Sequence, residues 1–194
     1  MPLLSDHGND SISNTNQDLI WKAFKKGKKW AFEKIYKLTY NDLYRFGIKF
    51  IQNPELIEDI IHDLYFKLWQ RKETISTPSN IKAYLLSSVR ATIINHLKQQ
   101  NRNTEDSNPD SFNLESSVEE LYIFNESLEE NIRILNNELN NLTAKQKEAI
   151  YLHYILELNY KEVSGIMGIK LQSVRNLVHE GITKLKLARD KFLR

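Results

Sequence analysis

The chain has 194 residues, enough for one domain or two small ones, and its 41% hydrophobic and 27% charged residues are ordinary for a soluble globular protein. Only 6 Gly and 4 Pro argue against an all-β fold, and the absence of Cys excludes disulfides and zinc–thiolate sites and indicates a reducing compartment. The polar N-terminus has no signal-peptide core, and no apolar run reaches the roughly 18 residues that a membrane span needs, so we expect a cytoplasmic protein without membrane insertion.

The first half of the chain is predicted to be helical after a disordered N-terminus at residues 1–17, which is rich in Ser, Asn and Asp. Asp18 is a plausible N-cap for a first helix that places Leu19, Ile20 and Phe24 on one side. Further helices are predicted at residues 30–50, 55–71 and 81–100, with a polar loop at 74–80. In the helix at 55–71, Ile57, Ile60, Ile61, Leu64 and Leu68 form a stripe that must face a core.

The second half begins with a linker at residues 104–140, and a helix-prone segment at 118–142, which runs two residues past this linker, carries one apolar stripe. Three compact helices follow, at 144–155, 160–167 and 171–192, and no strand is predicted anywhere. The expected fold is all-α, with two small helical domains at residues 18–103 and 141–194 joined by the linker.

The net charge of +2 hides a segregated pattern. Residues 18–103 hold 16 Lys and Arg against 8 Asp and Glu, and residues 141–194 hold 10 against 5. Between them, residues 104–140 hold 10 acidic residues against Arg133 alone. This pattern indicates two units that bind polyanions, joined by an acidic segment that can act as a polyanion mimic. Basic helical surfaces that are merely solvated would give the same charge balance.

A helix-turn-helix pattern lies between Asn159 and Lys186. Asn159 and Glu162 form an approximate capping box, and Gly168 supplies a residue free to adopt a positive φ at the turn. The following helix buries an apolar side and exposes a polar one, on which Arg and Asn or Gln can hydrogen-bond to guanine and adenine edges. An ordinary helix pair with a glycine turn is the alternative. Candidate DNA contacts on this unit are Lys170, Gln172, Ser173, Arg175, Asn176, His179 and Lys184.

The chain resembles sigma factors of the extracytoplasmic-function (ECF) group, most closely those of the Bacteroidetes. The resemblance in the second half rests on residues 142–149 (LTAKQKEA), 160–163 (YKEV), 166–169 (IMGI) and 173–176 (SVRN), which are similar to region 4, the module that binds the minus-thirty-five promoter element. In the first half, residues 57–69 (IEDIIHDLYFKLW) resemble the polymerase-binding helix of region 2. Residues 81–85 (IKAYL), continuing to 95–98 (NHLK), resemble the helix that reads the minus-ten element. The likeness spans roughly residues 18–187 and implies a protein that binds core RNA polymerase, through its β′ and β subunits, and promoter DNA.

The resemblance implies that the helix at 55–71 docks on a basic coiled coil of the polymerase β′ subunit. Carboxylates beside an aromatic side chain suit such a partner, whereas a solvated face is the alternative interpretation. The residues assigned to this contact are Glu58, Asp59, His62, Asp63 and Phe66. Trp69 is expected to be a core residue.

The family melts DNA and captures a flipped base beside the loop that precedes the reading helix, which here is the loop at 74–80. Basic and polar residues on the following helix can hold the single-stranded backbone. The residues assigned to the minus-ten element are Thr77, Ser79, Asn80, Arg90, Asn95, Lys98 and Arg102. Ala91 stands where many relatives carry Asn, so the base that is read is not assigned.

Region 4 departs from the family at several positions: Thr143 replaces a common Pro, Lys170 replaces a Ser or Thr cap, and Glu180 and Gly181 replace a basic residue and Ala. Because a glycine inside a helix costs about 1 kcal/mol against Ala, these changes predict weak intrinsic binding to the upstream element. The acidic linker is expected either to occupy the positively charged polymerase channel or to lie on the basic domains and suppress non-specific DNA binding.

An enzyme is not expected, since the sequence has no phosphate-cradling Gly loop and no nucleophile motif. The doublet His62-Asp63 matches metal-dependent phosphohydrolases but lacks their other ligands, so neither metal nor cofactor is predicted. A helix-turn-helix regulator that does not join polymerase is the main alternative, and a helical adaptor for acidic proteins is another. An anti-sigma factor that covers the binding faces is the expected regulatory partner.

Overall fold

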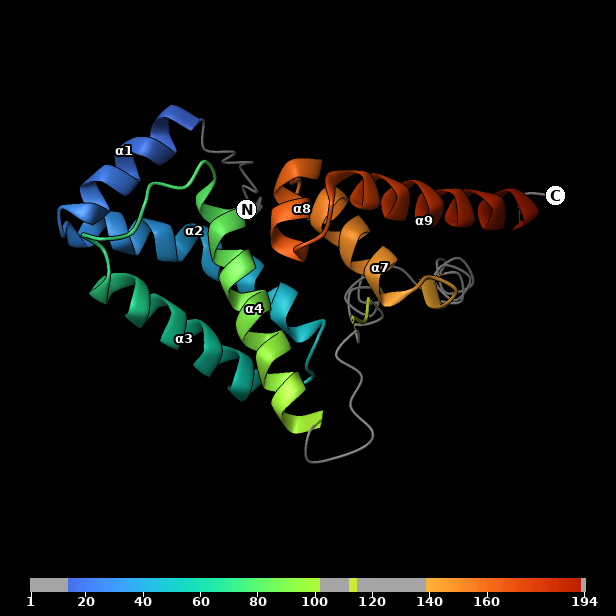
Figure 1. The fold of residues 1–194 in the computed structure, drawn as a ribbon, viewed down its shortest axis with the longest axis horizontal. Coiled ribbons are helices and arrows are strands. Elements are labelled where there is room, and N and C mark those ends of the chain that lie inside the picture. The colour runs from blue at the N-terminus through green and yellow to red at the C-terminus, as the bar shows by residue number, and fades with distance from the viewer. Residues whose placement is uncertain (1–13, 102–111, 115–138, 193–194) are drawn as a thin grey trace, which may run out of the picture.

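A computed structural model describes residues 14–101, 112–114 and 139–192 of the chain, and the regular structure in these residues is entirely helical (Figure 1). The elements in order are α1 (Asn14–Lys25), α2 (Lys29–Ile48), α3 (Pro54–Gln70), α4 (Ile81–Asn101), α7 (Ala144–Ile150), the π-helical turn η2 (Tyr151–Ile155), α8 (Tyr160–Met167) and α9 (Leu171–Phe192). The predicted all-α fold with two helical groups is confirmed. The predicted helix at 118–142 lies mostly outside the described residues.

The first helix differs from its prediction at both its start and its buried face. Helix α1 begins at Asn14, four residues before the expected cap at Asp18. Its buried edge is formed by Ile20, Trp21 and Phe24, whereas Leu19 is 61% exposed. Placing Leu19 in the apolar stripe was therefore wrong, because positions 20, 21 and 24 share one side of the helix and position 19 lies outside it.

Helices α1 to α4 enclose the N-terminal core. Helix α3 begins as predicted, with Pro54 in the first turn and the Asn53 side chain accepting a hydrogen bond from the backbone N–H of Leu56 at 3.2 Å. Its stripe of Ile57, Ile60, Ile61 and Leu68 is buried against α2 and α4. This packing fixes which side of α3 is turned to solvent.

Two helices of the C-terminal unit, α7 and α8, each begin with a complete capping box. Thr143 and Gln146 bond reciprocally at the start of α7, and Asn159 and Glu162 do so at the start of α8. Gly168 ends α8 with φ +65°, as its place at the turn predicts. Helices α8 and α9 have the bounds that the sequence predicted.

Gly181 lies where α7 and α9 pack closely. A Cβ atom at this position would lie 2.6 Å from Cδ1 of Ile150, so the missing side chain allows the two helices to approach closely. The neighbouring Glu180 accepts a hydrogen bond from the Gln146 side chain at 3.2 Å. The Glu180–Gly181 pair thus fits α7, and the weak promoter binding inferred from this pair and the other departures in region 4 stays a prediction.

We expect Gly181→Ala to lower the free energy of unfolding by about 1 kcal/mol, because overpacking against Ile150 costs about 1–3 kcal/mol and the helix-propensity gain is about 1 kcal/mol. Ile150→Val removes the Cδ1 atom concerned and should cost about 0.5–1.5 kcal/mol alone. Urea unfolding of both single variants and the double variant should then show a favourable coupling of about 1 kcal/mol. Simple additivity would contradict the steric role assigned to Gly181.

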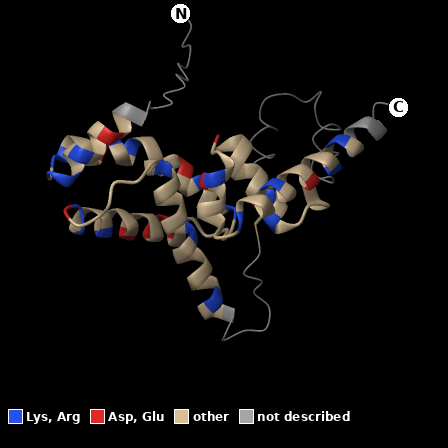
Figure 2. Cartoon of the chain, turned by 45° about the horizontal axis from the view of Figure 1, so that its top comes forward, with Lys and Arg blue, Asp and Glu red and all other residues tan. Residues whose placement is uncertain are grey.

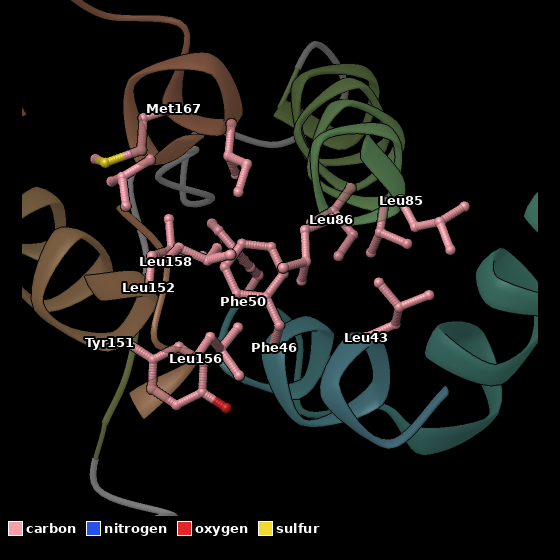
Figure 3. Close-up of a cluster of buried hydrophobic side chains, with 14 of the residues drawn as sticks. Leu43, Phe46, Phe50, Leu85, Leu86, Tyr151, Leu152, Leu156, Leu158 and Met167 are labelled. Carbon is pink, nitrogen blue, oxygen red and sulfur yellow. The ribbon is translucent and has the colours of Figure 1, made fainter. Parts of the chain in front are cut away.

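The two helical units share an apolar cluster, which the sequence did not predict (Figure 3). Phe46 of α2 lies against Tyr151 of η2, with 6.4 Å between ring centroids. Helix α4 also packs along α8. The N- and C-terminal units therefore form one packed body in this structure.

Candidate functional site

One face of α3 gathers the residues that sequence analysis assigned to a protein contact. All five of them are exposed, and the Phe66 side chain is 60% exposed although it is a large apolar group. The acids of α3 are visible in Figure 2 along this helix. These exposed residues are Glu58, Asp59, His62, Asp63 and Phe66. An acidic surface with one exposed aromatic ring fits a basic protein partner better than a buried ligand.

Two grooves flank α3 and share His62. One, of about 490 Å³, is lined by apolar rings that include Phe32, Tyr36 and Phe66. The other, of about 400 Å³, lies on the α4 side of the helix and includes Asp59 and Asp63. The exposed face of α3 thus lies between a groove lined by aromatic rings and a mixed groove to which Asp59 and Asp63 contribute.

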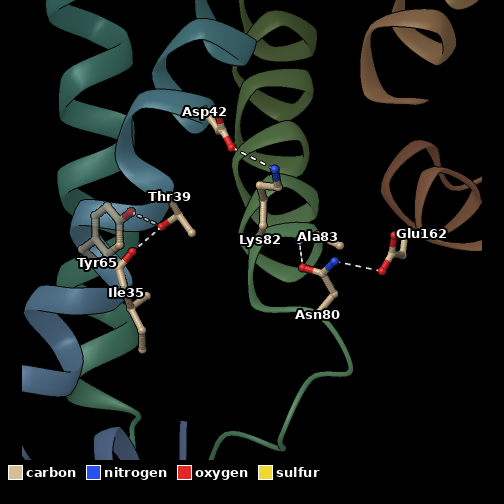
Figure 4. A network of polar contacts seen from close by, with 8 residues as sticks. All are labelled: Ile35, Thr39, Asp42, Tyr65, Asn80, Lys82, Ala83 and Glu162. Carbon is tan, nitrogen blue, oxygen red and sulfur yellow. Dashed lines mark hydrogen bonds and ion pairs between the residues drawn. The ribbon is translucent and has the colours of Figure 1, made fainter. Parts of the chain in front are cut away.

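The floor of the apolar groove is formed by Tyr65, which is held by a hydrogen bond. Tyr65 is buried and its hydroxyl shares a 2.7 Å hydrogen bond with the Thr39 hydroxyl, which also donates to the Ile35 carbonyl at 2.7 Å (Figure 4). Burial raises the pKa of Tyr65 well above its usual range, so the ring stays neutral. Trp69, expected in the core, is partly buried with its ring 5.2 Å from that of Phe32.

The residues assigned to the minus-ten element fall into two groups. Thr77 and Ser79 in the loop before α4 are exposed, as are Asn95 and Lys98 on α4. The second group, Asn80 and Arg90, faces the C-terminal unit and is bonded to it. Arg102 lies outside the described residues.

Asn80 and Arg90 each contact a glutamate of the C-terminal unit. Asn80 caps α4 through Oδ1, which accepts from the backbone N–H of Ala83 at 3.1 Å, and its Nδ2 donates to Glu162 at 2.9 Å (Figure 4). Arg90 binds Glu148 with two hydrogen bonds, of 2.5 and 3.1 Å. Sequence reasoning missed both of these contacts, because the partners are 58 or more residues apart and helical periodicity reports only neighbours along the chain.

The residues assigned to the minus-thirty-five element are all exposed, while Val174 and Val178 on the same helix are buried. On the exposed side, the Gln172 amide donates to Asn176 at 3.0 Å, which orients two amide groups toward solvent. The exposed set is Lys170, Gln172, Ser173, Arg175, Asn176, His179 and Lys184. Lys184 differs from the others because its ammonium group turns back to the Gln146 side chain at 3.3 Å.

Within the described residues, no cluster of three or more His, Asp or Glu is arranged to hold a metal ion. Those residues also include no helix with the length and apolar character needed to cross a membrane.

Family models and related proteins match the chain over both helical units. The model described as Sigma-70 region 2 matches residues 35–103, and that described as Sigma-70, region 4 matches residues 132–185. The ECF RNA polymerase sigma factor SigM of Bacillus subtilis is 23% identical over 156 residues, which cover 80% of this chain and 93% of the relative. The ECF RNA polymerase sigma factor SigC of Mycobacterium tuberculosis is 23% identical over 156 residues, covering 79% and 80%.

Two solved structures have the same fold. The sigma factor RpoE of Bartonella quintana, in complex with the anti-sigma factor NepR, superposes with a TM-score of 0.57 at 20% identity, covering 82% of this chain and 96% of that one. CnrH, in complex with the cytosolic domain of CnrY, gives a TM-score of 0.58 at 14% identity, covering 90% and 97%.

Proposed function

The chain belongs to the extracytoplasmic-function group of the sigma-70 family, and we propose that it docks on core RNA polymerase through α3 and contacts promoter DNA through α4 and α9. As an alternative sigma factor it binds the core enzyme and directs promoter recognition, melting and transcription initiation. Sigma factors are initiation factors rather than enzymes, and we assign no catalytic residue. We place its action in the cytoplasm, with region 2 at residues 18–103, the acidic linker at 104–140 and region 4 at 141–194.

The observation that carries the polymerase assignment is the exposed face of α3. Four titratable side chains and Phe66 share this face, while the opposite side of the helix is buried. An exposed ring beside carboxylates provides an apolar contact surrounded by charges that steer a basic helix toward it. The groove bordered by Phe32 and Tyr36 offers space for an apolar side chain of that partner.

Promoter contacts divide between two helices. The loop before α4 and the exposed part of α4, which includes Asn95 and Lys98, face single-stranded DNA at the minus-ten element. The N-terminal half of α9 enters the major groove at the minus-thirty-five element, with Arg175 and Asn176 reading base edges. Lys184 contributes electrostatically from beside Gln146. An anti-sigma factor is the proposed regulatory partner, supported by the RpoE–NepR likeness.

Arg175→Ala tests the upstream contact. We expect the affinity of the reconstituted holoenzyme for its promoter to fall about 5- to 150-fold, the equivalent of about 1–3 kcal/mol for a lost base contact. The promoter is obtained by selecting random DNA with the wild-type holoenzyme, and affinity is measured by fluorescence anisotropy. Thr183→Ala, at another exposed position of α9, is the matched control and should bind as wild type. Equal affinity of Arg175→Ala and the control would place base reading elsewhere.

The experiment that tests the function is sequence-specific DNA binding with and without bacterial core RNA polymerase. A sigma factor should be retained on the core enzyme and should select a promoter only in its presence. A helix-turn-helix regulator would select a duplex alone, and an adaptor would show no sequence preference. Selection of a specific duplex without core enzyme, together with no retention on it, would overturn the proposal.

A further inference from the structure

Helix α1 reaches the start of α4, the helix assigned to the minus-ten element. The Gln17 side chain of α1 accepts a hydrogen bond through Oε1 from the backbone N–H of Ile81, the first residue of α4, at 3.0 Å. The two residues are 64 positions apart in the sequence. The match to Sigma-70 region 2 begins at residue 35, so all of α1 lies outside the matched residues. The contact therefore joins the matched region to a helix that has no assigned part in promoter recognition.

The Gln17 side chain supplies an acceptor that α4 cannot supply itself. As the first residue of α4, Ile81 cannot bond its N–H within the helix. Asn80, the preceding residue, uses its Oδ1 for the N–H of Ala83 at 3.1 Å (Figure 4). Ile81 is only 5% exposed, so water has little access to its N–H. Gln17 and Asn80 thus cap α4 together, one from a distant helix and one from its own turn.

A ring contact one turn farther along both helices supports the same junction. Trp21 of α1 is fully buried, and its ring meets that of Tyr84 of α4 edge-on, with 5.9 Å between centroids. Positions 17 and 21 share one face of α1, as positions 81 and 84 share one face of α4. The hydrogen bond is therefore one of two contact points, which together limit rotation of the start of α4 relative to α1.

The same hydrogen bond fixes one end of the loop at 74–80, which is assigned to the flipped base. At the other end, the backbone N–H of Ile75 donates to the Arg71 carbonyl at 3.1 Å. Between the two ends lie Thr77 and Ser79, which are exposed. The connection runs beside α1 on its way to α4 (Figure 1). A short segment held at both ends has few accessible conformations, so little entropy is lost when it closes around a base.

We propose that Gln17 is a positioning residue for base capture at the minus-ten element. Its Oε1 holds the start of α4, and with it the loop at 74–80, so that the surface that takes the flipped base is formed before DNA binds. Gln17 itself needs no contact with DNA. The proposal rests on the proposed function, because the part of the loop in base capture belongs to that function.

Three substitutions separate the oxygen acceptor from the rest of the side chain. Gln17→Met keeps the length and helix propensity of glutamine but removes the acceptor. Gln17→Glu keeps an acceptor at the same place, and its charge is favourable at the N-terminal end of α4. Asn16→Met places the same new side chain at the neighbouring exposed position of α1 and is the matched control. Neither position belongs to the buried core, so all three variants should fold, which circular dichroism checks.

Hydrogen exchange of the free, full-length protein tests the contact without polymerase or DNA. The Ile81 amide, followed by NMR, should exchange at least about fivefold faster in Gln17→Met than in wild type, the equivalent of about 1 kcal/mol for one hydrogen bond. Gln17→Glu and Asn16→Met should exchange at the wild-type rate. Equal rates in Gln17→Met and wild type would overturn the proposal.

Base capture by the holoenzyme tests the consequence of the contact. A base analogue that fluoresces when unstacked is placed in turn at each position of the non-template minus-ten element, in the promoter selected with the wild-type holoenzyme. DNA is saturating, so differences in affinity do not contribute. The ratio of captured to stacked base should fall at least about fivefold in Gln17→Met. Gln17→Glu and Asn16→Met should keep the wild-type ratio, and all four proteins should be retained equally on core polymerase.

Two results would overturn the positioning role of Gln17. One is wild-type base capture by Gln17→Met despite faster exchange at Ile81. The other is an equal loss of capture in Gln17→Met and Gln17→Glu, because the acceptor would then not be the determinant. A wild-type holoenzyme that captures no base at any position would instead contradict the proposed function, and the exchange rates would show separately whether Gln17 holds α4.

Discussion

Replacing Asp59 and Asp63 of α3 with arginine is expected to abolish retention on core RNA polymerase. Both positions are exposed, and the side chain of Asp63 is 75% exposed while it pairs with Lys67 at 3.8 Å. Surface pairs of this kind contribute little to stability, so the fold should persist. At an interface with a basic helix, however, the change places like charges together, which costs several kcal/mol. Helical circular dichroism and pull-down on immobilised core enzyme measure the two effects.

A matched charge reversal separates a local contact from a general charge effect. Asp18→Arg/Glu73→Arg makes the same change in net charge at two exposed positions outside α3. This control should be retained like wild type. If both double variants lose retention, net charge rather than the α3 face governs binding; if neither does, α3 is not the polymerase contact.

The local features of the fold could be predicted from the sequence because they depend on neighbours along the chain. The capping box at Asn159 and Glu162 and the turn at Gly168 were predicted, and α8 and α9 have the predicted bounds. The exposure of Asp59 and Asp63 follows in the same way from the apolar stripe on the opposite side of α3. Helical periodicity identifies which residues share a face, and that information decides burial in a single helix.

Contacts between distant segments could not be predicted from the sequence. Arg90 was assigned to DNA, and in the structure it binds Glu148. The sequence did not predict this partner, because a basic side chain on a helix carries no signal for a residue in another domain. Phe112 lies within a segment that was interpreted as a linker, and one aromatic residue among polar ones does not predict burial against both domains. Gly181 was interpreted from helix propensity alone, whereas the close approach of Ile150 decides its role.

Two phenylalanines of region 2 should separate stability from function most sharply. Phe46 is fully buried, and its ring contacts Phe50, Phe112 and Tyr151. Phe46→Ala should lower the free energy of unfolding by about 3–5 kcal/mol, since it removes a large side chain and leaves a cavity between the two domains. For a domain of ordinary stability, about 5–15 kcal/mol, this change leaves a substantial unfolded fraction at moderate urea concentration.

Phe66→Ala removes the same side chain from a position where it is 60% exposed, and it should leave the free energy of unfolding within about 0.5 kcal/mol of wild type. Its effect should fall on polymerase affinity, with a loss of about 2 kcal/mol or more if the ring is a central contact. Urea unfolding and equilibrium binding to core enzyme are measured on both variants. Phe46→Ala should lose stability, and Phe66→Ala should lose polymerase affinity while it keeps its stability. A stable Phe66→Ala protein with wild-type affinity would remove the aromatic ring from the interface and leave the carboxylates as its determinants. A destabilised one would show that the partly buried ring of Phe66 supports the packing of region 2.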